Sequence, residues 1–399
     1  MRVLLASNAS YDPPRGGSTR SNLVWLKHLA SHGHQCVVVS PTLGEADRVT
    51  VQDGIEIHGV KDLSFRAAEL GKRIRETQPE WVLVSSEDVG HVLVREASTV
   101  APGRIVYLAH TPQFYPFGPE SWHPDESGTE AVRRAAAVVV IGEHMAGYVR
   151  RHLGRESVVI HPPLYGTPPY RQFGRFGSGF VLMINPCVVK GVRIFLELAR
   201  QFPEVEFAAL NGWGTTQADR DALRSGANTR LLENVPDIEE VLEQARLLLM
   251  PSVWYEGFGL IAMEAMLRGL PVIASNSGGL EEAKRGTGYV VPVKPVERYE
   301  RVFDETHMPR AVVPEQDTQA WAAALRTLLS DEEAYWGEAR RSREAGLAFV
   351  SRLDAGDFER MLRGLAPCTE PLRTEDRLKS LDAQKRALLL ARLKKKAQG

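Results

Sequence analysis

Short runs of aliphatic and β-branched residues alternate with amphipathic segments along the first half of the chain. In one amphipathic segment, residues 21–31, leucines recur at three-residue spacing and Gly33 follows, which predicts a helix and its end. A repeated strand–helix–strand pattern is typical of a parallel sheet with helices on both faces. The strands predicted here are Arg2–Ser7, Cys36–Ser40, Trp81–Ser85, Ile105–Ala109, Val138–Ile141 and Val158–Ile160.

A second alternating series follows residues 161–179, a segment rich in Pro and Gly that has no apolar period and is typical of an interdomain linker. The sequence therefore predicts an α/β protein with two doubly wound units in tandem. Ligands of such sheets bind beyond the carboxyl ends of the strands, so we expect a site in a cleft shared by both units. The strands predicted in this series are Phe180–Ile184, Val205–Leu210, Arg230–Leu232, Leu247–Met250, Val272–Ala274 and Tyr289–Val291.

The pattern changes again in the last quarter of the chain. Residues 294–316 are charged, contain Pro and lack periodicity, which predicts a loop. Helices are predicted over Thr318–Leu329 and from Glu332 to about Leu365. A polar linker then leads to a basic amphipathic segment, residues 377–397.

Composition narrows the class of protein. A chain of 399 residues exceeds what one hydrophobic core usually holds, which favours two domains. The net charge of -1 gives no overall field to attract nucleic acid, so we expect no nucleic-acid partner. Three isolated cysteines argue against a disulfide framework or a zinc cluster. Without a signal-peptide core or an apolar run of the ~20 residues that cross a bilayer, we expect a cytoplasmic protein, at most peripheral to a membrane.

The stretch from Pro251 to Met266 is the most informative about chemistry. A predicted strand ends at Ser252, a loop with two glycines follows, and a helix begins near Leu260. Backbone amides at such a turn bind anionic or hydroxyl oxygens. Glu256 in the loop and Glu264 on the helix could both accept hydrogen bonds from one polyhydroxylated ligand. The alternative is a surface loop charge and a salt-bridged helix residue.

This stretch resembles the Glu-x7-Glu motif of glycosyltransferase family 4, and the resemblance extends over residues 180–292. Asn234 to Asp237 looks like the family segment whose backbone, here at Val235, holds the nucleobase. Ser277 to Glu282 looks like the family's next glycine turn. The resemblance implies a GT-B fold, in which two tandem Rossmann-like domains turn their parallel sheets toward a central cleft.

The resemblance also implies roles for the motif's residues. Glu264 would bind the ribose hydroxyls of the donor nucleotide, and Glu256 would act catalytically near the hydroxyls of the transferred sugar. Backbone amides close to sugar and phosphate would come from Gly257, Phe258, Gly259 and Leu260.

Lys190 and Gly191 resemble the family's phosphate-binding Lys-Gly. The lysine would supply positive charge to the departing diphosphate, an interaction that strengthens as negative charge develops. Five residues earlier the family usually has arginine, and this chain has Asn185. Asparagine can donate to a phosphate oxygen but brings no charge, which leaves open slower turnover, another donor geometry or lost catalysis.

Gly16 and Gly17 follow the first predicted strand and precede a helix, where glycine lets backbone approach a ligand. In family 4 the corresponding loop faces the donor phosphates. His110 ends the strand Ile105–Ala109, and a histidine there is more often structural than catalytic. It looks like the family histidine that reaches the donor sugar, which implies a catalytic, sugar-positioning role.

The domains expected on this basis are an acceptor-binding domain and a donor domain, followed by a helix crossing back to the first domain and a tail. Their residues are 1–170, 171–345, 346–366 and 367–399.

No metal site is predicted. The Asp-x-Asp of Asp219 to Asp221 falls where a helix starts and is interpreted as N-terminal helix charge. The resemblance implies transfer without metal or cofactor, from a UDP- or GDP-type sugar donor.

The acceptor is not named by the sequence. Residues 112–125, with their aromatic side chains, could stack on a sugar or a planar aglycone, or form a lid packed on the domain. The basic segment 377–397 could pack on the body, lie on an anionic membrane surface, or dock to a modular synthase whose linker segments it resembles.

The function expected is a retaining transfer of a hexosyl group to a small-molecule (natural-product) or lipid-linked acceptor. Two alternatives stay open. One is a nucleotide-sugar-binding scaffold with little turnover, suggested by Asn185, and the other is a sugar-nucleotide epimerase of the same architecture, which would need acid and base groups instead of the Lys-Gly and Glu-x7-Glu pair.

Overall fold

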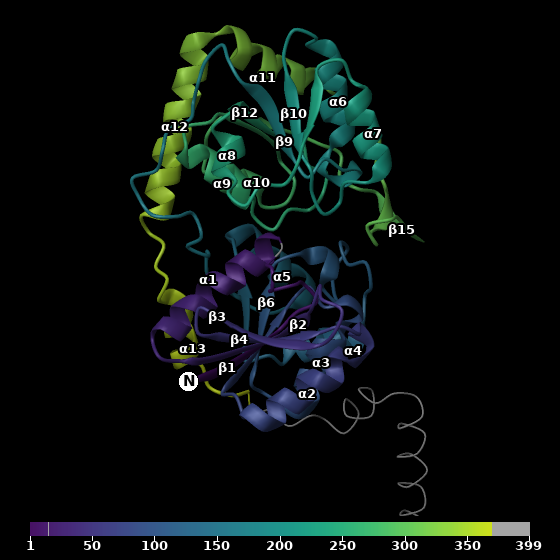
Figure 1. Ribbon diagram of the computed structural model, residues 1–399, viewed down its shortest axis with the longest axis vertical. Helices are drawn as coiled ribbons and strands as arrows, with labels where there is room; N and C mark the ends of the chain where they lie inside the picture. Colours follow the sequence, from purple (N-terminus) through teal and green to yellow (C-terminus); the bar gives the residue numbers. More distant parts are fainter. Residues whose placement is uncertain (15, 369–399) are drawn as a thin grey trace, which may run out of the picture. The chain divides into compact units, whose positions relative to one another are not determined.

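The computed structural model describes residues 1–14 and 16–368. The chain forms two units (Figure 1). Among the described residues, unit 1 contains Met1–Val140, Tyr148–Ile160 and residues 355–368, whereas unit 2 contains Ile141–Gly147 and His161–Asp354. Neither unit is continuous in sequence, because residues 141–147 belong to unit 2 while residues 148–160 belong to unit 1, and the chain returns to unit 1 at Ala355.

The sheet of unit 1 has eight strands in the order β3-β4-β2-β1-β5-β6-β7-β8. All neighbouring pairs are parallel except β3 with β4. The strands are β1 (Arg2–Ala6), β2 (Gln35–Pro41), β3 (Arg48–Gln52), β4 (Ile55–Val60), β5 (Trp81–Ser85), β6 (Ile105–Ala109), β7 (Ala137–Val140) and β8 (Val158–Val159).

The β3–β4 hairpin is absent from the sequence prediction, although the chain carries its signal. Val49 and Val51 alternate with polar residues, and Asp53-Gly54 follows. Both turn residues have left-handed backbones, with φ of 52° and 76°. That is the conformation of a two-residue hairpin turn, for which Asp-Gly is a favoured pair. β3 is largely exposed at the sheet edge, where burial imposes little apolar pattern, whereas β4 is mostly buried and its alternating Ile55 and Ile57 were sufficient to predict a strand.

The sheet of unit 2 has six strands, all parallel, in the order β11-β10-β9-β12-β13-β14. They are β9 (Phe180–Ile184), β10 (Phe207–Leu210), β11 (Thr229–Leu232), β12 (Ala245–Met250), β13 (Val272–Ser275) and β14 (Val290–Val291). The continuous buried runs of β9 and β12 reflect helices on both faces of the sheet. The two parallel α/β sheets predicted from the sequence are confirmed.

A separate antiparallel hairpin, β15 (Arg298–Phe303) with β16 (Pro309–Val312), stands where the sequence analysis predicts a loop. That expectation is wrong. Asp304 closes the hairpin by accepting hydrogen bonds from the amides of Thr306 and Met308 at 2.8 and 3.1 Å. Most residues of β15 are exposed, so burial imposed no apolar alternation that the sequence could show.

Helices cover both sheets (Figure 1). In unit 2 the core packs β9, β10, β12 and β13 against apolar faces of two helices, α6 and α11. The α-helices are α1 (Gly17–Ser31), α2 (Arg66–Thr77), α3 (Val92–Val100), α4 (Glu126–Arg133), α5 (Glu143–Leu153), α6 (Val192–Gln201), α7 (Gln217–Ser225), α8 (Glu239–Leu242), α9 (Leu260–Leu267), α10 (Leu280–Ala283), α11 (Gln319–Ser330), α12 (Glu332–Val350) and α13 (Asp357–Gly364).

The last predicted helix, Glu332 to about Leu365, is two helices. α12 ends at Val350, and α13 begins at Asp357 after a short connection. The break lets α13 pack on α1 in unit 1, where the ring of Phe358 stacks on Trp25 at 4.7 Å between centroids and 9° between planes. Both rings are almost fully buried. The basic segment 377–397 lies outside the described residues.

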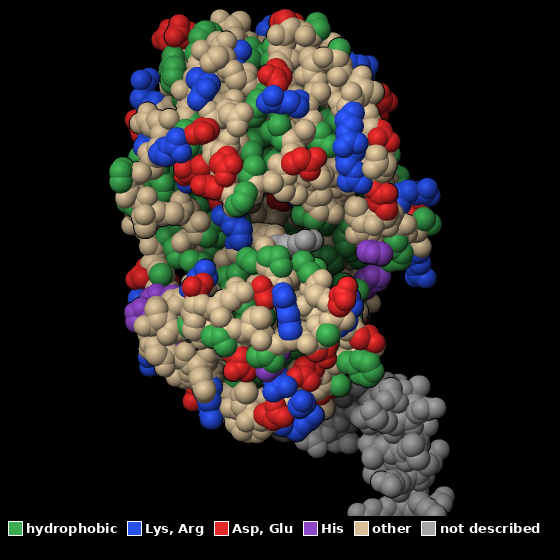
Figure 2. Space-filling view, in the orientation of Figure 1, with side chains coloured by type: hydrophobic (Ala, Val, Ile, Leu, Met, Phe, Trp, Pro, Cys, Tyr) green, Lys and Arg blue, Asp and Glu red, His purple; other side chains and the backbone are tan. Residues whose placement is uncertain are grey.

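Acidic and basic side chains are interspersed over the face shown in Figure 2. In the part of the chain that the structure describes, no helix combines the length and the apolar composition required to traverse a bilayer.

We expect Phe358→Ala to lower the free energy of unfolding by about 3 to 5 kcal/mol, because it empties a buried site against Trp25. Urea denaturation measures this change. Phe65 is 62% exposed in the same unit, so Phe65→Ala is a matched control expected to cost less than about 0.5 kcal/mol. Equal effects of the two substitutions would show that α13 does not hold this position.

Candidate functional site

Each sheet contains a point at which the strand order reverses. In unit 2 the chain runs from β9 outward through β10 to β11 and returns to β12 on the other side of β9. The loops after β9 and β12 therefore lie next to each other at the carboxyl edge of the sheet, which is where open α/β sheets bind ligands. In unit 1 the same reversal lies between β1 and β5.

Lys190 and Glu256 meet at the reversal point of unit 2. Lys190 ends the short 3-10 helix Val188–Lys190 after β9, and its Nζ lies 2.5 Å from Oε1 of Glu256 in the loop after β12. The hydroxyl of Ser252 donates to the same oxygen at 2.7 Å. Lysine and glutamate are 17% and 13% exposed, so Glu256 is not the surface loop charge of the alternative interpretation.

This ion pair leaves binding capacity on the lysine. An ammonium has three N–H donors, and Glu256 takes one of them. The indole of Trp254 lies under Nζ at 5.4 Å from the ring centroid, which adds a cation–π contact. The result is a positive charge held in a fixed place, with donors left for an anionic ligand.

Gly191 makes the pairing possible because it lets the two loops approach closely. Its φ is 84°, and a Cβ added there would overlap the carbonyl of Pro251. The carbonyl of Val189 also accepts hydrogen bonds from the amides of Val253 and Trp254, both at 2.9 Å. Gly191 is therefore required by backbone packing, which the sequence analysis did not consider.

The glycine turn after β13 supports the Glu256 loop from its other side. The amide of Gly279 donates to the carbonyl of Glu256 at 2.8 Å, and Ser277 Oγ donates to the carbonyl of Trp254 at 2.6 Å. A Cβ on Gly278 would overlap the backbone of Glu256. Three loops at the sheet edge thus fix one another.

Asn185 follows β9 directly and has a left-handed backbone, with a φ of 57°. Asparagine tolerates this conformation better than most residues. Its Oδ1 accepts a hydrogen bond from the amide of Gly214 at 2.9 Å, and its buried Nδ2 has no partner among the described residues. The side chain thus joins the loops after β9 and β10.

The remaining donor-site residues of unit 2 lie at the same edge of the sheet. Gly259, with φ 111°, precedes α9, which begins at Leu260 and carries Glu264 as a buried residue. The ring of Phe258 is buried against Phe349, so only its backbone could contact a ligand. Val235 lies between β11 and α8. Their roles in donor binding stay predictions.

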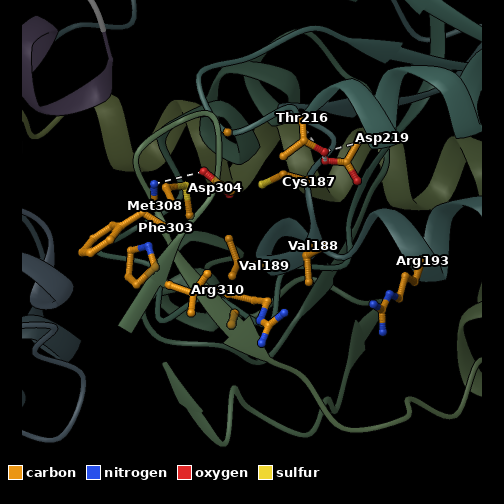
Figure 3. Close-up of a pocket in the computed structure, with 14 residues that line it drawn as sticks. Cys187, Val188, Val189, Arg193, Thr216, Asp219, Phe303, Asp304, Met308 and Arg310 are labelled. Atoms are coloured by element: carbon orange, nitrogen blue, oxygen red, sulfur yellow. Dashed lines mark hydrogen bonds between the residues drawn. The ribbon is translucent and has the colours of Figure 1, made fainter. Parts of the chain in front are cut away.

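A cavity of about 340 Å³ adjoins the 3-10 helix Val188–Lys190. The hairpin β15–β16 forms one wall with Phe303, Met308 and Arg310 (Figure 3). Asp219 of α7 lines another side and closes a capping box with Thr216, which agrees with the helix-start interpretation of Asp219. Lys190, Glu256 and Glu264 are not among the lining residues, so this cavity is separate from the ion pair.

In unit 1, His110 follows β6 and is 4% exposed. Its Nε2 lies 2.8 Å from Oδ1 of Asn22 in α1. Nδ2 of Asn22 donates to Tyr11 Oη at 2.8 Å and to Ser85 Oγ at 3.1 Å. Ser85 in turn donates to Glu87 at 2.5 Å, which completes a polar network at the carboxyl ends of β1, β5 and β6.

The network determines the protonation of His110. Because Asn22 uses its amide nitrogen as donor to Tyr11 and Ser85, its oxygen must accept, and Nε2 of His110 carries the proton. Burial lowers the pKa of His110, so the ring is neutral at pH 7, although Glu87 opposes the shift. Nδ1 then presents a lone pair, and it has no partner among the described residues.

Gly16 and Gly17 lie where the sequence analysis predicts. Gly16, with φ 88°, precedes α1, and Gly17 is its first residue. A Cβ on Gly16 would meet no atom within 4 Å, so the left-handed backbone and not crowding favours glycine there.

Several contributors to these arrangements carry no signal in the sequence. Asn22 and Tyr11 are distant in sequence from His110, so only the tertiary structure identifies their contacts. Ser252 lies four residues before Glu256, but this spacing did not reveal the hydrogen bond between the two side chains.

Comparisons with known proteins match most of the chain. A family model described as glycosyltransferase family 4 matches residues 15–164, and one described as glycosyl transferases group 1 matches residues 178–331. A D-inositol 3-phosphate glycosyltransferase of Corynebacterium urealyticum is 34% identical over 101 residues, which are 24% of this chain and 18% of that relative. The α-1,3/1,6-mannosyltransferase alg-2 of Neurospora crassa is 36% identical over 77 residues, 18% of this chain and 16% of that relative. The matched segments thus span less than a fifth of these curated relatives.

Solved structures resemble the chain over nearly its whole length. Sucrose-phosphate synthase from Thermosynechococcus elongatus has a TM-score of 0.68 and 16% identity over 91% of this chain and 98% of its own. HepE of Anabaena, solved with UDP and glucose, has a TM-score of 0.64 and 18% identity over the same shares. Such similarity establishes the GT-B fold.

We expect Gly191→Ala to destabilise unit 2 more than Gly177→Ala, by at least about 1 kcal/mol. Both glycines have a left-handed backbone, with φ of 84° and 82°, but only Gly191 has a carbonyl in the space that a Cβ would take. Urea denaturation compares the two variants. Equal losses of stability would mean that the loops after β9 and β12 are farther apart than described.

As the pH decreases below 6.5, the free energy of unfolding should decrease, in part because of His110. Its pKa in the folded protein is lowered, so the unfolded chain binds a proton first, and unfolding becomes more favourable until the folded ring also titrates. We expect His110→Gln to flatten the slope of unfolding free energy against pH by up to about 1.4 kcal/mol per pH unit. His123→Gln, at an exposed histidine of unit 1, is the control and should keep the wild-type slope.

Proposed function

Since this chain belongs to glycosyltransferase family 4, we propose that it transfers a hexosyl group from a UDP- or GDP-type sugar to a small-molecule or lipid-linked acceptor, with retention at the anomeric carbon. The observation that carries the proposal is the Lys190–Glu256 pair at the reversal point of the unit 2 sheet. HepE, which shares the fold, was solved with UDP-glucose. That ligand supports a nucleotide-sugar donor here.

In the proposed reaction, the bond between C1 of the sugar and the diphosphate oxygen breaks while C1 bonds to the acceptor oxygen. The departing diphosphate oxygen keeps the electron pair of the broken bond and accepts the proton of the acceptor hydroxyl. Lys190 stabilises the growing negative charge on that diphosphate, because a fixed cation interacts more strongly with the transition state than with the donor.

Three carboxylate and imidazole groups position the donor. Glu256 accepts hydrogen bonds from sugar hydroxyls through the oxygen that Lys190 and Ser252 leave available, Oε2. Glu264 accepts from the ribose hydroxyls. His110, neutral and protonated on Nε2, accepts from a sugar hydroxyl at Nδ1.

Asn185 does not supply the positive charge that an arginine brings at this position in the family. Asn185 is neutral, and its buried Nδ2 could supply a hydrogen bond but no charge. Lys190 therefore carries more of the charge stabilisation than it would beside an arginine. Transfer without a metal ion is part of this proposal.

A nucleotide-sugar-binding scaffold is the second candidate, and the uncharged Asn185 is the observation that favours it. Its left-handed backbone and its bond to Gly214 argue that asparagine is fitted to this position. Asn185→Arg therefore separates the candidates. An enzyme adapted to asparagine loses stability and rate in this variant, whereas a large gain in transfer would support a scaffold derived from an enzyme.

We expect thermal stabilisation by one nucleotide diphosphate among a panel of UDP, GDP and ADP and their sugars, since a ligand of the folded state raises the melting temperature. Glu264→Ala should abolish the shift. Lys190→Ala should weaken the shift and lower the rate of donor consumption by about 10²- to 10³-fold. Lys294→Ala, at an exposed lysine of the same unit, is the control. No shift with any nucleotide at millimolar concentration would reject the donor site.

A further inference from the structure

Three histidines and a carboxylate gather where α1 and α13 meet in unit 1. His28 lies in the last turn of α1, His32 caps its C-terminal end, and His34 precedes β2. Glu359 reaches them from α13, 325 residues after His34. The four side chains are outside the residues assigned to transfer.

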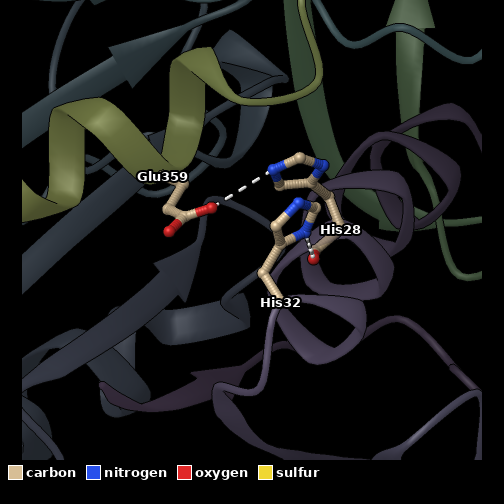
Figure 4. Close-up of side chains that lie close together, drawn as sticks. All are labelled: His28, His32 and Glu359. Carbon is tan, nitrogen blue, oxygen red and sulfur yellow. Dashed lines mark hydrogen bonds and ion pairs between the residues drawn. The ribbon is translucent and has the colours of Figure 1, made fainter.

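The ligand atoms of His28, His32 and Glu359 all lie within 4.8 Å of one another. His28 and His32 are four residues apart on one helix face, and their rings lie 4.1 Å apart between centroids. Figure 4 shows Glu359 directed at the His28 ring, with the ring of His32 beside it. Two imidazoles at this spacing together with a carboxylate are a ligand set of zinc sites in proteins.

Hydrogen bonds prepare His32 as a ligand. Its Nδ1 lies 2.8 Å from the backbone carbonyl of His28. Because a carbonyl can only accept, Nδ1 carries the proton and Nε2 presents its lone pair. Histidine ligands of metals are commonly fixed by such a bond from the other ring nitrogen.

The two oxygens of Glu359 have different surroundings. Oε1 accepts from Nε2 of His34 at 2.9 Å and from Nε of Arg363 at 2.8 Å. Oε2 faces Nε2 of His28 at 3.3 Å. His34 and Arg363 thus hold the carboxylate by one oxygen and direct the other toward His28.

The field of the helix also suits a cation here. The carbonyl groups at the C-terminal end of α1 carry partial negative charge and are closest to His28 and His32. Glu359 adds a carboxylate charge, which the guanidinium of Arg363 offsets in part on the side of Oε1. His32 is exposed, so an ion can enter from solvent, and a water molecule can complete a tetrahedral set.

We propose that His28, His32 and Glu359 bind a divalent transition-metal ion, with Zn²⁺ as the best fit, which clips α13 to α1. Nitrogen and oxygen ligands about 2.0 to 2.1 Å from zinc lie roughly 3.3 Å from each other. The side chains must therefore close by on the order of 1 Å, which the exposed ring of His32 allows. The ion ties the returning C-terminal segment to unit 1 and takes no part in transfer.

Zinc titration of the chelator-treated full chain by calorimetry tests the proposal. We expect one Zn²⁺ per chain, a melting temperature raised by several degrees at saturation, and slower amide hydrogen exchange in α13. His32→Ala and Glu359→Gln should each weaken zinc binding at least tenfold. Both should keep the metal-free melting temperature within a few degrees, which separates lost binding from misfolding.

His123→Ala is the matched control, because it removes another exposed histidine of unit 1. It should bind zinc as the wild type does. Tetrahedral absorption bands with Co²⁺ in the wild type, and their loss in His32→Ala, identify the geometry. Zinc binding that is absent, or that is equal in the His32→Ala and His123→Ala variants, overturns the proposal. None of these measurements depends on transfer activity, so they stand apart from the test of the donor site.

Discussion

The close approach of two backbone segments in unit 2 is the constraint on which the site depends. The loops after β9 and β12 touch where Gly191 lies against the carbonyl of Pro251, and the carbonyl of Val189 joins them through two hydrogen bonds. Only glycine fits at this contact. Because the loops are held together here, Lys190 and Glu256, which are 66 residues apart in the chain, face each other from the loops that follow two neighbouring strands.

The contact between these loops explains how the ammonium of Lys190 can be held in place without being fully buried. A lysine removed from water loses hydration, and the carboxylate of Glu256 and the indole of Trp254 offset this loss. The pair stays part-exposed, so an anionic ligand can still reach the ammonium. Preorganised charge of this kind needs little rearrangement when a reaction develops negative charge beside it.

In unit 1, by contrast, the buried imidazole of His110 is uncharged within a polar network. Asn22 distributes hydrogen bonds among Tyr11, Ser85 and His110, and burial holds the imidazole uncharged. Buried polar networks are costly when a member is unpaired. Nδ1 of His110 is a buried atom of this network that has no partner among the described residues.

The sequence by itself determined the two parallel sheets, the position of Lys190 and Glu256 at strand ends, and the family. Burial on both faces forces long apolar runs in parallel strands, and loop motifs keep fixed spacing, so both leave local patterns. It did not show the exposed edge strand β3, the hairpin β15–β16 or the break before α13, where burial imposes little pattern. Only the tertiary structure decided that Gly191 meets Pro251, that Asn22 sets the tautomer of His110, and that Glu359 joins His28 and His32. These contacts join residues distant in the chain, and their geometry follows from packing, which no local spacing records.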